Sequence, residues 1–179
     1  MGATLLAGTL TVFLAALFLR AAWHKSQAFL ETTGFVADYG VLPPGREALA
    51  TRALILAEAG IVAALVLPAT RMAGAALAAA LLLAYAGAMA AALKAGRRRI
   101  DCGCGGAPQF VSALTLGRNL ALAALALALA ALSAGAPAGA GVPGAALSLA
   151  AGLTLWCLYG IVERLIANAG HIGLARDRL

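Results

Sequence analysis

The sequence predicts an all-α polytopic membrane protein, and its composition carries that prediction. Of the 179 residues, 63% are hydrophobic, whereas soluble domains are about half apolar. Only 11% are charged, and a soluble domain of this size needs about a quarter. An alanine-rich soluble helical protein is therefore the disfavoured alternative. The length suits one membrane domain over residues 1–179.

Five apolar stretches are long enough to cross about 30 Å of hydrocarbon. Each must be helical, because in lipid only a helix satisfies its backbone hydrogen bonds within one segment. The first is expected to be a retained span rather than a signal peptide, since no basic segment precedes it and no small-residue cleavage site follows it. The five spans run approximately over residues 4–23, 50–67, 71–93, 111–134 and 145–167.

The connections between these spans differ in character. The second and third spans are joined by a short turn at Pro68, and the fourth and fifth by the Gly-, Ala- and Pro-rich segment 135–144. The first connection, 24–49, mixes charged and aromatic residues, including Lys25. That mixture predicts a partly helical segment at the membrane interface. Small residues within the spans, such as Gly60, Gly74 and Gly87, predict close helix packing.

Basic residues gather on one face of the predicted bundle. With five alternating spans, the 24–49 connection, the 94–110 connection and the C-terminal tail share that face, and only Arg71 flanks a span on the other. By the positive-inside rule the basic face is cytoplasmic and the N-terminus lies outside. The abundance of Ala, Gly, Leu and Arg indicates a bacterial chain, hence the bacterial cytoplasmic membrane. The basic face carries Arg20, Lys25, Arg46, Arg52, Lys94, Arg97, Arg98, Arg99, Arg118, Arg164, Arg176 and Arg178.

This placement also explains the net charge of +6. Basic side chains at the ends of apolar runs meet lipid headgroups. The sequence lacks the interleaved basic and aromatic residues that are typical of nucleic-acid binding. The basic side chains are therefore expected to contact the lipid bilayer.

The most informative motif is the pair Cys102 and Cys104, separated by one glycine. Thiols react as thiolates, which nearby positive charge and a helix N-terminus favour. Arg97, Arg98 and Arg99 precede the pair, and the fourth span follows it. A disulfide between residues i and i+2 closes a strained ring, and strain makes it easier to reduce. The pair is therefore predicted to be a catalytic dithiol/disulfide couple.

Two alternatives for the pair stay open. The two thiols could be free and without consequence, or they could hold Zn or Cu(I), although His24 and His171 are the only histidines available as further ligands. No residue is therefore assigned as a metal ligand. Cys157, within the fifth span, is interpreted as a packing residue, with the resolution of a mixed disulfide as its alternative role.

Ionisable residues also lie within the spans. Glu58 is in the second span, Arg118 in the fourth and Arg20 in the first, with His24 one helical turn further on. Charge at membrane depth costs at least about 2.5 kcal/mol, so it suggests function. Glu58 and Arg118 are expected to meet, with Asn119 nearby. Two interpretations remain open, a structural ion pair and a polar pocket for a quinone headgroup or a proton relay.

Several of these pieces, in order, resemble the MauE branch of the DoxX-like membrane proteins. They are HKSQAF at 24–29, YGVLP at 39–43, Glu58 in the following helix, the basic stretch with CGC at 97–105, and GRN at 117–119. The similarity covers about residues 10–132. It implies a DoxX-like four-helix bundle, here with a fifth C-terminal transmembrane helix.

The resemblance also implies a function. MauE is associated with methylamine utilisation and the maturation of methylamine dehydrogenase, alongside a thioredoxin-like partner. The fold is reminiscent of quinone-linked thiol oxidoreductases, so quinone is the cofactor to consider. The leading hypothesis is a membrane thiol–disulfide redox protein. A non-catalytic subunit or assembly factor of a larger oxidoreductase complex is the second hypothesis, and thiolate metal handling is the third.

Overall fold

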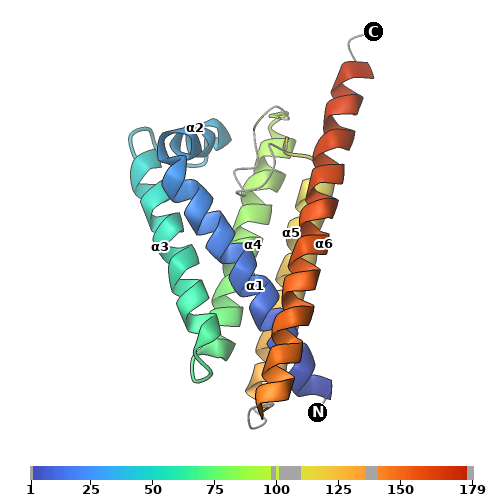
Figure 1. The fold of residues 1–179 in the computed structure, drawn as a ribbon. Coiled ribbons are helices and arrows are strands. Elements are labelled where there is room, and N and C mark those ends of the chain that lie inside the picture. The colour runs from blue at the N-terminus through green and yellow to red at the C-terminus, as the bar shows by residue number, and fades with distance from the viewer. Residues whose placement is uncertain (1, 98–99, 101–109, 136–140, 177–179) are drawn as a thin grey trace.

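The computed structural model describes residues 2–97, 100, 110–135 and 141–176. Within these ranges the chain forms six α-helices (Figure 1), five of which are long and apolar enough to cross a membrane. The all-helical, polytopic prediction is confirmed. The helices are α1 (Gly2–Gln27), α2 (Phe29–Tyr39), α3 (Glu47–Val66), α4 (Arg71–Lys94), α5 (Ala113–Ala134) and α6 (Gly141–Arg176).

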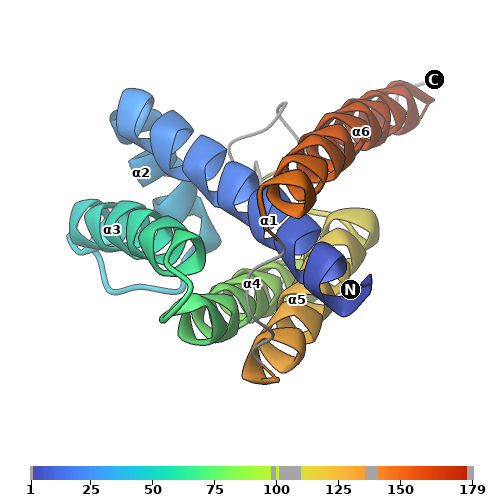
Figure 2. The same cartoon turned by 60° about the horizontal axis from the view of Figure 1, so that its bottom comes forward.

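Four of the long helices make a bundle, and the fifth lies outside it. Along the ring, α1 packs on α3, α3 on α4, α4 on α5, and α5 returns to α1. The last helix, α6, packs on α1, as the oblique view in Figure 2 shows. The core contains large side chains alternating with alanine, which lets the helices approach closely. Its fully buried members include Phe13, Leu14, Leu65, Ala75, Ala78, Ala126 and Leu129.

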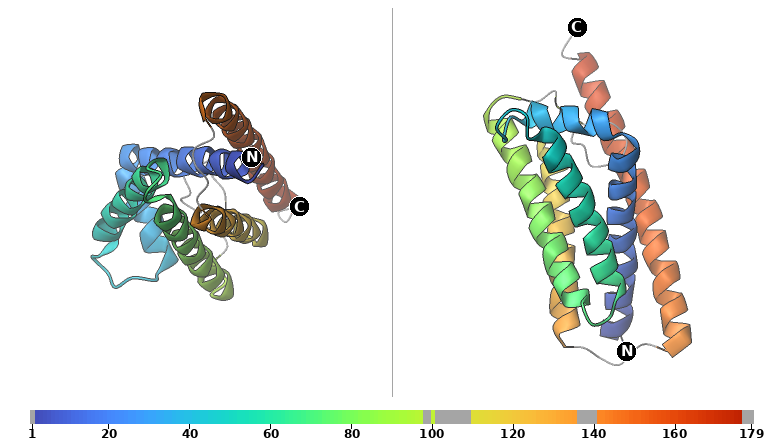
Figure 3. Two further views of the ribbon diagram at one scale, coloured as in Figure 1. Left: turned by 90° about the horizontal axis from the view of Figure 1, so that it is seen from below. Right: turned by 90° about the vertical axis from the view of Figure 1, so that its left-hand side faces the viewer.

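The short helix α2 crosses one end of this bundle (Figure 3). It contacts α3 and, less extensively, α1 and α4. Gly40 ends the helix with φ of 59°, in the left-handed region that glycine adopts without strain. A side chain at this position would overlap the guanidinium of Arg97. The partly helical segment expected in the first connection is therefore present.

One residue of that connection lies elsewhere than expected. The sequence placed Lys25 in the interfacial connection, but α1 continues through Gln27 and carries Lys25 into the interior, where it is 2% exposed. The reason is that helix length is set by packing as well as hydropathy. A buried acid on α3, described below, stabilises the ammonium inside the bundle.

The two ends of the bundle carry the connections that alternating spans require. The start of α1, the turn between α3 and α4, and the facing ends of α5 and α6 lie at one end (Figure 1). At the other end lie α2, the end of α4, the start of α5 and the C-terminal end of α6. The described helix ends that flank the basic connections therefore share one end of the molecule.

Only one of the three glycines singled out from the sequence lies at a close approach. A Cβ on Gly74 would lie 2.8 Å from the backbone of Ala64 and Leu65, so α3 and α4 touch there. A Cβ on Gly60 or Gly87 would meet nothing within 4 Å. For these two the prediction of close packing is wrong, because both face away from neighbouring helices.

Gly74→Ala is expected to lower the free energy of unfolding by about 1–3 kcal/mol, because backbone atoms must move to admit the methyl group. Gly87→Ala is the matched control on the same helix. It is expected to leave stability unchanged or to raise it by about 0.5–1 kcal/mol through helix propensity. Denaturant titration in mixed micelles measures both. Equal effects of the two substitutions would contradict the close approach at Gly74.

Candidate functional site

A buried ion pair lies where α1, α3 and α4 meet beneath α2. Lys25 Nζ donates to Glu58 Oε1 at 2.7 Å, and the two side chains are 3% and 0% exposed. Tyr85 Oη donates to the same carboxylate oxygen at 2.8 Å. The ammonium lies 5.6 Å from the centroid of the Tyr85 ring, within the range of a cation–π contact.

The hydrogen bonds of this group are unevenly shared. Both donors bond to Oε1 of Glu58, and Oε2 is buried with no hydrogen-bond partner in the described part of the chain. An ammonium has three N–H donors, and within the described part of the chain Lys25 uses one of them, toward Glu58. Buried polar groups normally have partners. The remaining N–H donors of Lys25 and the Oε2 atom of Glu58 could therefore form hydrogen bonds with a bound polar molecule.

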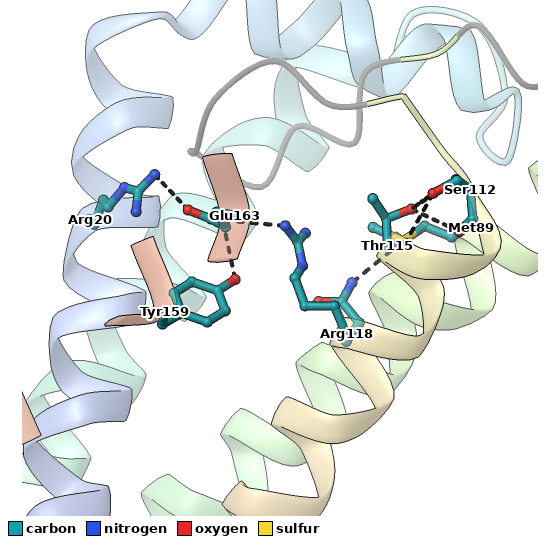
Figure 4. Close-up of polar contacts among 8 residues, drawn as sticks. Arg20, Met89, Ser112, Thr115, Arg118, Tyr159 and Glu163 are labelled. Atoms are coloured by element: carbon teal, nitrogen blue, oxygen red, sulfur yellow. Dashed lines mark hydrogen bonds and ion pairs between the residues drawn. The ribbon is translucent and has the colours of Figure 1, made fainter. Parts of the chain in front are cut away.

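A second buried cluster joins α1, α5 and α6 around Glu163 (Figure 4). Its carboxylate lies 2.9 Å from Nη2 of Arg20 and 3.3 Å from Nη1 of Arg118, and it accepts a 3.1 Å hydrogen bond from Tyr159. The side chains of Arg118 and Glu163 are 7% and 4% exposed, whereas that of Arg20 is 32% exposed. This cluster ties α6 to the bundle.

The start of α5 is fixed at the same end of the molecule. Ser112 caps the helix, because its Oγ accepts from the backbone N–H of Thr115 while Thr115 Oγ1 accepts from that of Ser112. The backbone N–H of Val111 donates to the carbonyl of Ile100 at 3.0 Å, and both side chains are buried beside Met89. Ile100 and Val111 thus lie side by side at this end of the bundle.

Two cavities adjoin the ion pair. A cavity of about 340 Å³ lies under α2, between α3 and α4, and its walls are mostly apolar. A smaller one of about 30 Å³ lies deeper and is lined by Glu58, Arg118, Asn119 and Tyr159 among others. Lys25 and Tyr85 line both. They therefore lie between an apolar chamber and a smaller cavity whose lining mixes polar and apolar side chains.

The structure separates some of the residues that the sequence grouped. Glu58 forms its ion pair with Lys25, and Arg118 forms its pair with Glu163, so the expected meeting of Glu58 and Arg118 is wrong as a direct contact. The two residues share only the small cavity. The reason is that each has a nearer counter-ion, which composition alone does not reveal.

The remaining predicted residues have varied placements. Arg20 belongs to the Glu163 cluster, and Asn119 is buried with its amide 3.5 Å from the sulfur of Met89. His24 is half-buried, and its Nδ1 has no hydrogen-bond partner in the described ranges. Arg97 donates to the carbonyls of Asp38 and Tyr39, at 3.2 and 2.9 Å, and so fixes the end of α2.

The cysteine motif falls outside the part of the chain that the structure describes. Arg98, Arg99, Cys102 and Cys104 all lie in the ranges left undescribed. Cys157 is exposed on α6, so its interpretation as a packing residue is wrong. Among the described residues, no group of three His, Cys, Asp or Glu side chains could hold a metal ion.

Three site residues were missed by sequence reasoning. Glu163 lies within the fifth predicted span, so the criterion that identified Glu58 would also have found it. Lys25 was assigned to an interfacial connection, and nothing in its local sequence predicts burial. Tyr85 is one aromatic residue in a long apolar run, and its role depends on the helix that faces it.

Comparison with known proteins assigns the chain to a family. Residues 3–132 match the family model described as methylamine utilisation protein MauE. The MauE of Paracoccus denitrificans is 40% identical over 152 residues, which are 84% of this chain and 81% of that protein. The MauE of Methylophilus methylotrophus is 31% identical over 158 residues, covering 87% and 83% of the two chains.

A third relative, the MauE of Paracoccus versutus, is 38% identical over 149 residues, which cover 82% of this chain and 80% of that protein. No solved structure matches the chain. The family match covers most of the bundle, and the relatives cover most of the chain. The resemblance identified from the sequence is therefore confirmed, and the chain belongs to the MauE family of methylamine utilisation proteins.

Proposed function

We propose that this chain is a membrane thiol–disulfide redox protein in which Cys102 and Cys104 cycle between dithiol and disulfide. Through this exchange the protein would serve a thioredoxin-like partner or the maturation of an oxidoreductase in methylamine utilisation. The observation that carries the proposal is the order of the motif, with three arginines before the cysteine pair and a helix after it. Positive charge and a helix N-terminus both favour the thiolate.

The fold supports the proposal in one respect. Ile100 and Val111 pair through their backbones, and Ser112 caps α5 just beyond them. Ile100 and Val111, which lie before and after the cysteine pair in the sequence, are therefore both held against the bundle. The N-terminal end of α5, with its positive partial charge, lies at that same place.

The expected chemistry is thiol–disulfide exchange. The Cys102 thiolate attacks one sulfur of a partner disulfide, which forms a mixed disulfide and releases a partner thiolate. The Cys104 thiolate then attacks Cys102 Sγ and releases the second partner thiolate. The result is a partner dithiol and a Cys102–Cys104 disulfide, with two electrons transferred and no sulfur lost. The reverse reaction runs through the same intermediate.

The proposed setting is the bacterial cytoplasmic membrane, with the N-terminus outside. The support is the charge asymmetry, because twelve of the thirteen Lys and Arg residues belong to the end that carries α2 and the cysteine connection. Under this proposal the cysteine pair and the C-terminus face the cytoplasm.

Differential alkylation of the cysteine pair tests oxidation state and sidedness together. In a Cys157→Ser background only the pair contributes thiols, and Cys157 is exposed, so its loss is not expected to disturb the fold. We expect thiol labelling to rise by two per chain after reduction. We also expect an impermeant maleimide to react in inside-out vesicles and not in intact cells.

Two outcomes would overturn parts of this proposal. Labelling of the cysteine pair from the outside of intact cells would contradict the proposed orientation. A cysteine pair that stays fully reduced after diamide treatment would refute the redox role. The variant Cys102→Ser with Cys104→Ser is expected to abolish growth on methylamine, while Cys157→Ser alone supports it. Normal growth of the double variant would favour a non-catalytic subunit instead.

A further inference from the structure

The cavity of about 340 Å³ under α2 has the size and character of a small-molecule site. Ligand pockets measure about 300–1,000 Å³ and combine apolar walls with a few polar groups. Here the walls include the aromatic rings of Phe35, Tyr39 and Tyr85, and the charged group is Lys25. The chamber thus suits an apolar ring that carries one or two polar atoms.

The ion pair restricts the charge of any occupant. Lys25 is neutralised by Glu58 at 2.7 Å, and both side chains are buried. A charged occupant would leave a net charge between mostly apolar walls, which is strongly unfavourable. Lys25 nevertheless has N–H donors that bond to nothing within the described chain. The best occupant is therefore neutral and brings a hydrogen-bond acceptor to the ammonium.

The cavity lies between two long helices of the bundle. Ala53 on α3 and Ala84 on α4 both line it, and both are exposed. These two helices are candidate membrane spans, so the surface between them meets lipid. An occupant would enter from the bilayer and must be lipid-soluble.

We propose that this cavity binds a lipid-soluble compound of the quinone class, with one ring carbonyl accepting a hydrogen bond from Lys25 Nζ. A quinone is neutral and planar, with carbonyl acceptors on an apolar body. The site stands on its own geometry, but its redox purpose rests on the proposed function. In the reverse direction of the proposed exchange, the Cys102–Cys104 disulfide oxidises a partner dithiol and is itself left as a dithiol. Reoxidation of that dithiol releases two electrons and two protons, and a quinone takes up both to become a hydroquinone.

Filling the cavity from its exposed wall tests the site without altering the ion pair. The substitution Ala84→Phe places a ring in the chamber, whereas Ala80→Phe places the same ring one turn earlier on the same helix, at an exposed position that does not line the cavity. Isothermal titration of the full chain in detergent with ubiquinone-1 measures binding. We expect Ala84→Phe to weaken it by about tenfold or more and Ala80→Phe to leave it unchanged.

A second pair of variants tests the role of Lys25. The double substitution Lys25→Met with Glu58→Gln removes both charges together, so no buried charge is left alone. Losing one hydrogen bond from a charged donor is expected to weaken ubiquinone-1 binding about tenfold to hundredfold. Elution volume and circular dichroism verify that the variant is folded. A folded double variant with unchanged affinity would refute the contact with Lys25.

The outcomes separate this inference from the redox proposal. Binding is expected to survive Cys102→Ser with Cys104→Ser, because the proposed contacts come from Lys25 and from the cavity walls on α2, α3 and α4. Absence of binding, or equal binding to the Ala84→Phe and Ala80→Phe variants, would overturn the site and leave the alkylation result standing. Oleate is the comparison ligand, since binding of this anion as tight as that of ubiquinone-1 would overturn the requirement for a neutral occupant.

Discussion

Lys25→Met is expected to lower the free energy of unfolding by about 3–5 kcal/mol, because it leaves a carboxylate buried without its counter-ion. Glu58 is fully buried, and among the described residues only the Tyr85 hydroxyl bonds to its carboxylate besides Lys25. Removal of one partner of a buried pair costs more than the pair itself contributes. The measurement is a denaturant titration in mixed micelles, followed by circular dichroism.

Lys94→Met is the matched control for this substitution. Lys94 is exposed at the end of α4, so its replacement is expected to change stability by no more than about 0.5 kcal/mol. The double variant Lys25→Met with Glu58→Gln is expected to be more stable than Lys25→Met alone, because the uncompensated charge is gone. A double variant as unstable as the sum of its two single variants would contradict a direct ion pair.

Glu163→Gln is expected to have the second-largest effect on stability and to lower the free energy of unfolding by roughly 3 kcal/mol. Its carboxylate lies between Arg20 on α1 and Arg118 on α5, and it is the charge on α6 that both guanidiniums face (Figure 4). Breaking a buried pair costs about 3–5 kcal/mol. We expect a value at the lower end of this range, because Arg20 is about one-third exposed and solvent screens its attraction to Glu163.

Hydrogen exchange gives this prediction a local readout. Since α6 lies outside the four-helix bundle and packs on α1, loss of the Glu163 cluster is expected to speed amide exchange in α6 more than in α3 or α4. Glu31→Gln, on the exposed side of α2, is the control and is expected to change neither stability nor exchange in α6. Uniform acceleration across all helices would argue against a role in attaching α6.

The architecture follows largely from the sequence. The five spans could be recognised because a membrane crossing requires a long apolar run and tolerates few charges, and both properties are local. The helical segment in the first connection could be recognised from its mixture of charged and aromatic residues. The family could be recognised from short motifs in a fixed order. Each inference needed only neighbouring residues.

The charged site was harder to predict, and the partners of its residues show why. Glu58 was identified as unusual, but its counter-ion proved to be Lys25, and Arg118 proved to pair with Glu163. Two acids and several bases within spans allow several pairings. The choice among them depends on which helices are adjacent, and adjacency is a property of the whole bundle.

The sequence alone determined the number of spans, the helical fold class, the concentration of positive charge at one end and the family. The tertiary structure decided which faces of the helices meet, where α6 attaches, and that α2 covers a chamber walled by Lys25 and Tyr85. The physical reason is the lipid environment. Apolar side chains suit both the core and the bilayer, so hydropathy does not distinguish inward from outward faces, and only packing and charge pairing between helices make that choice.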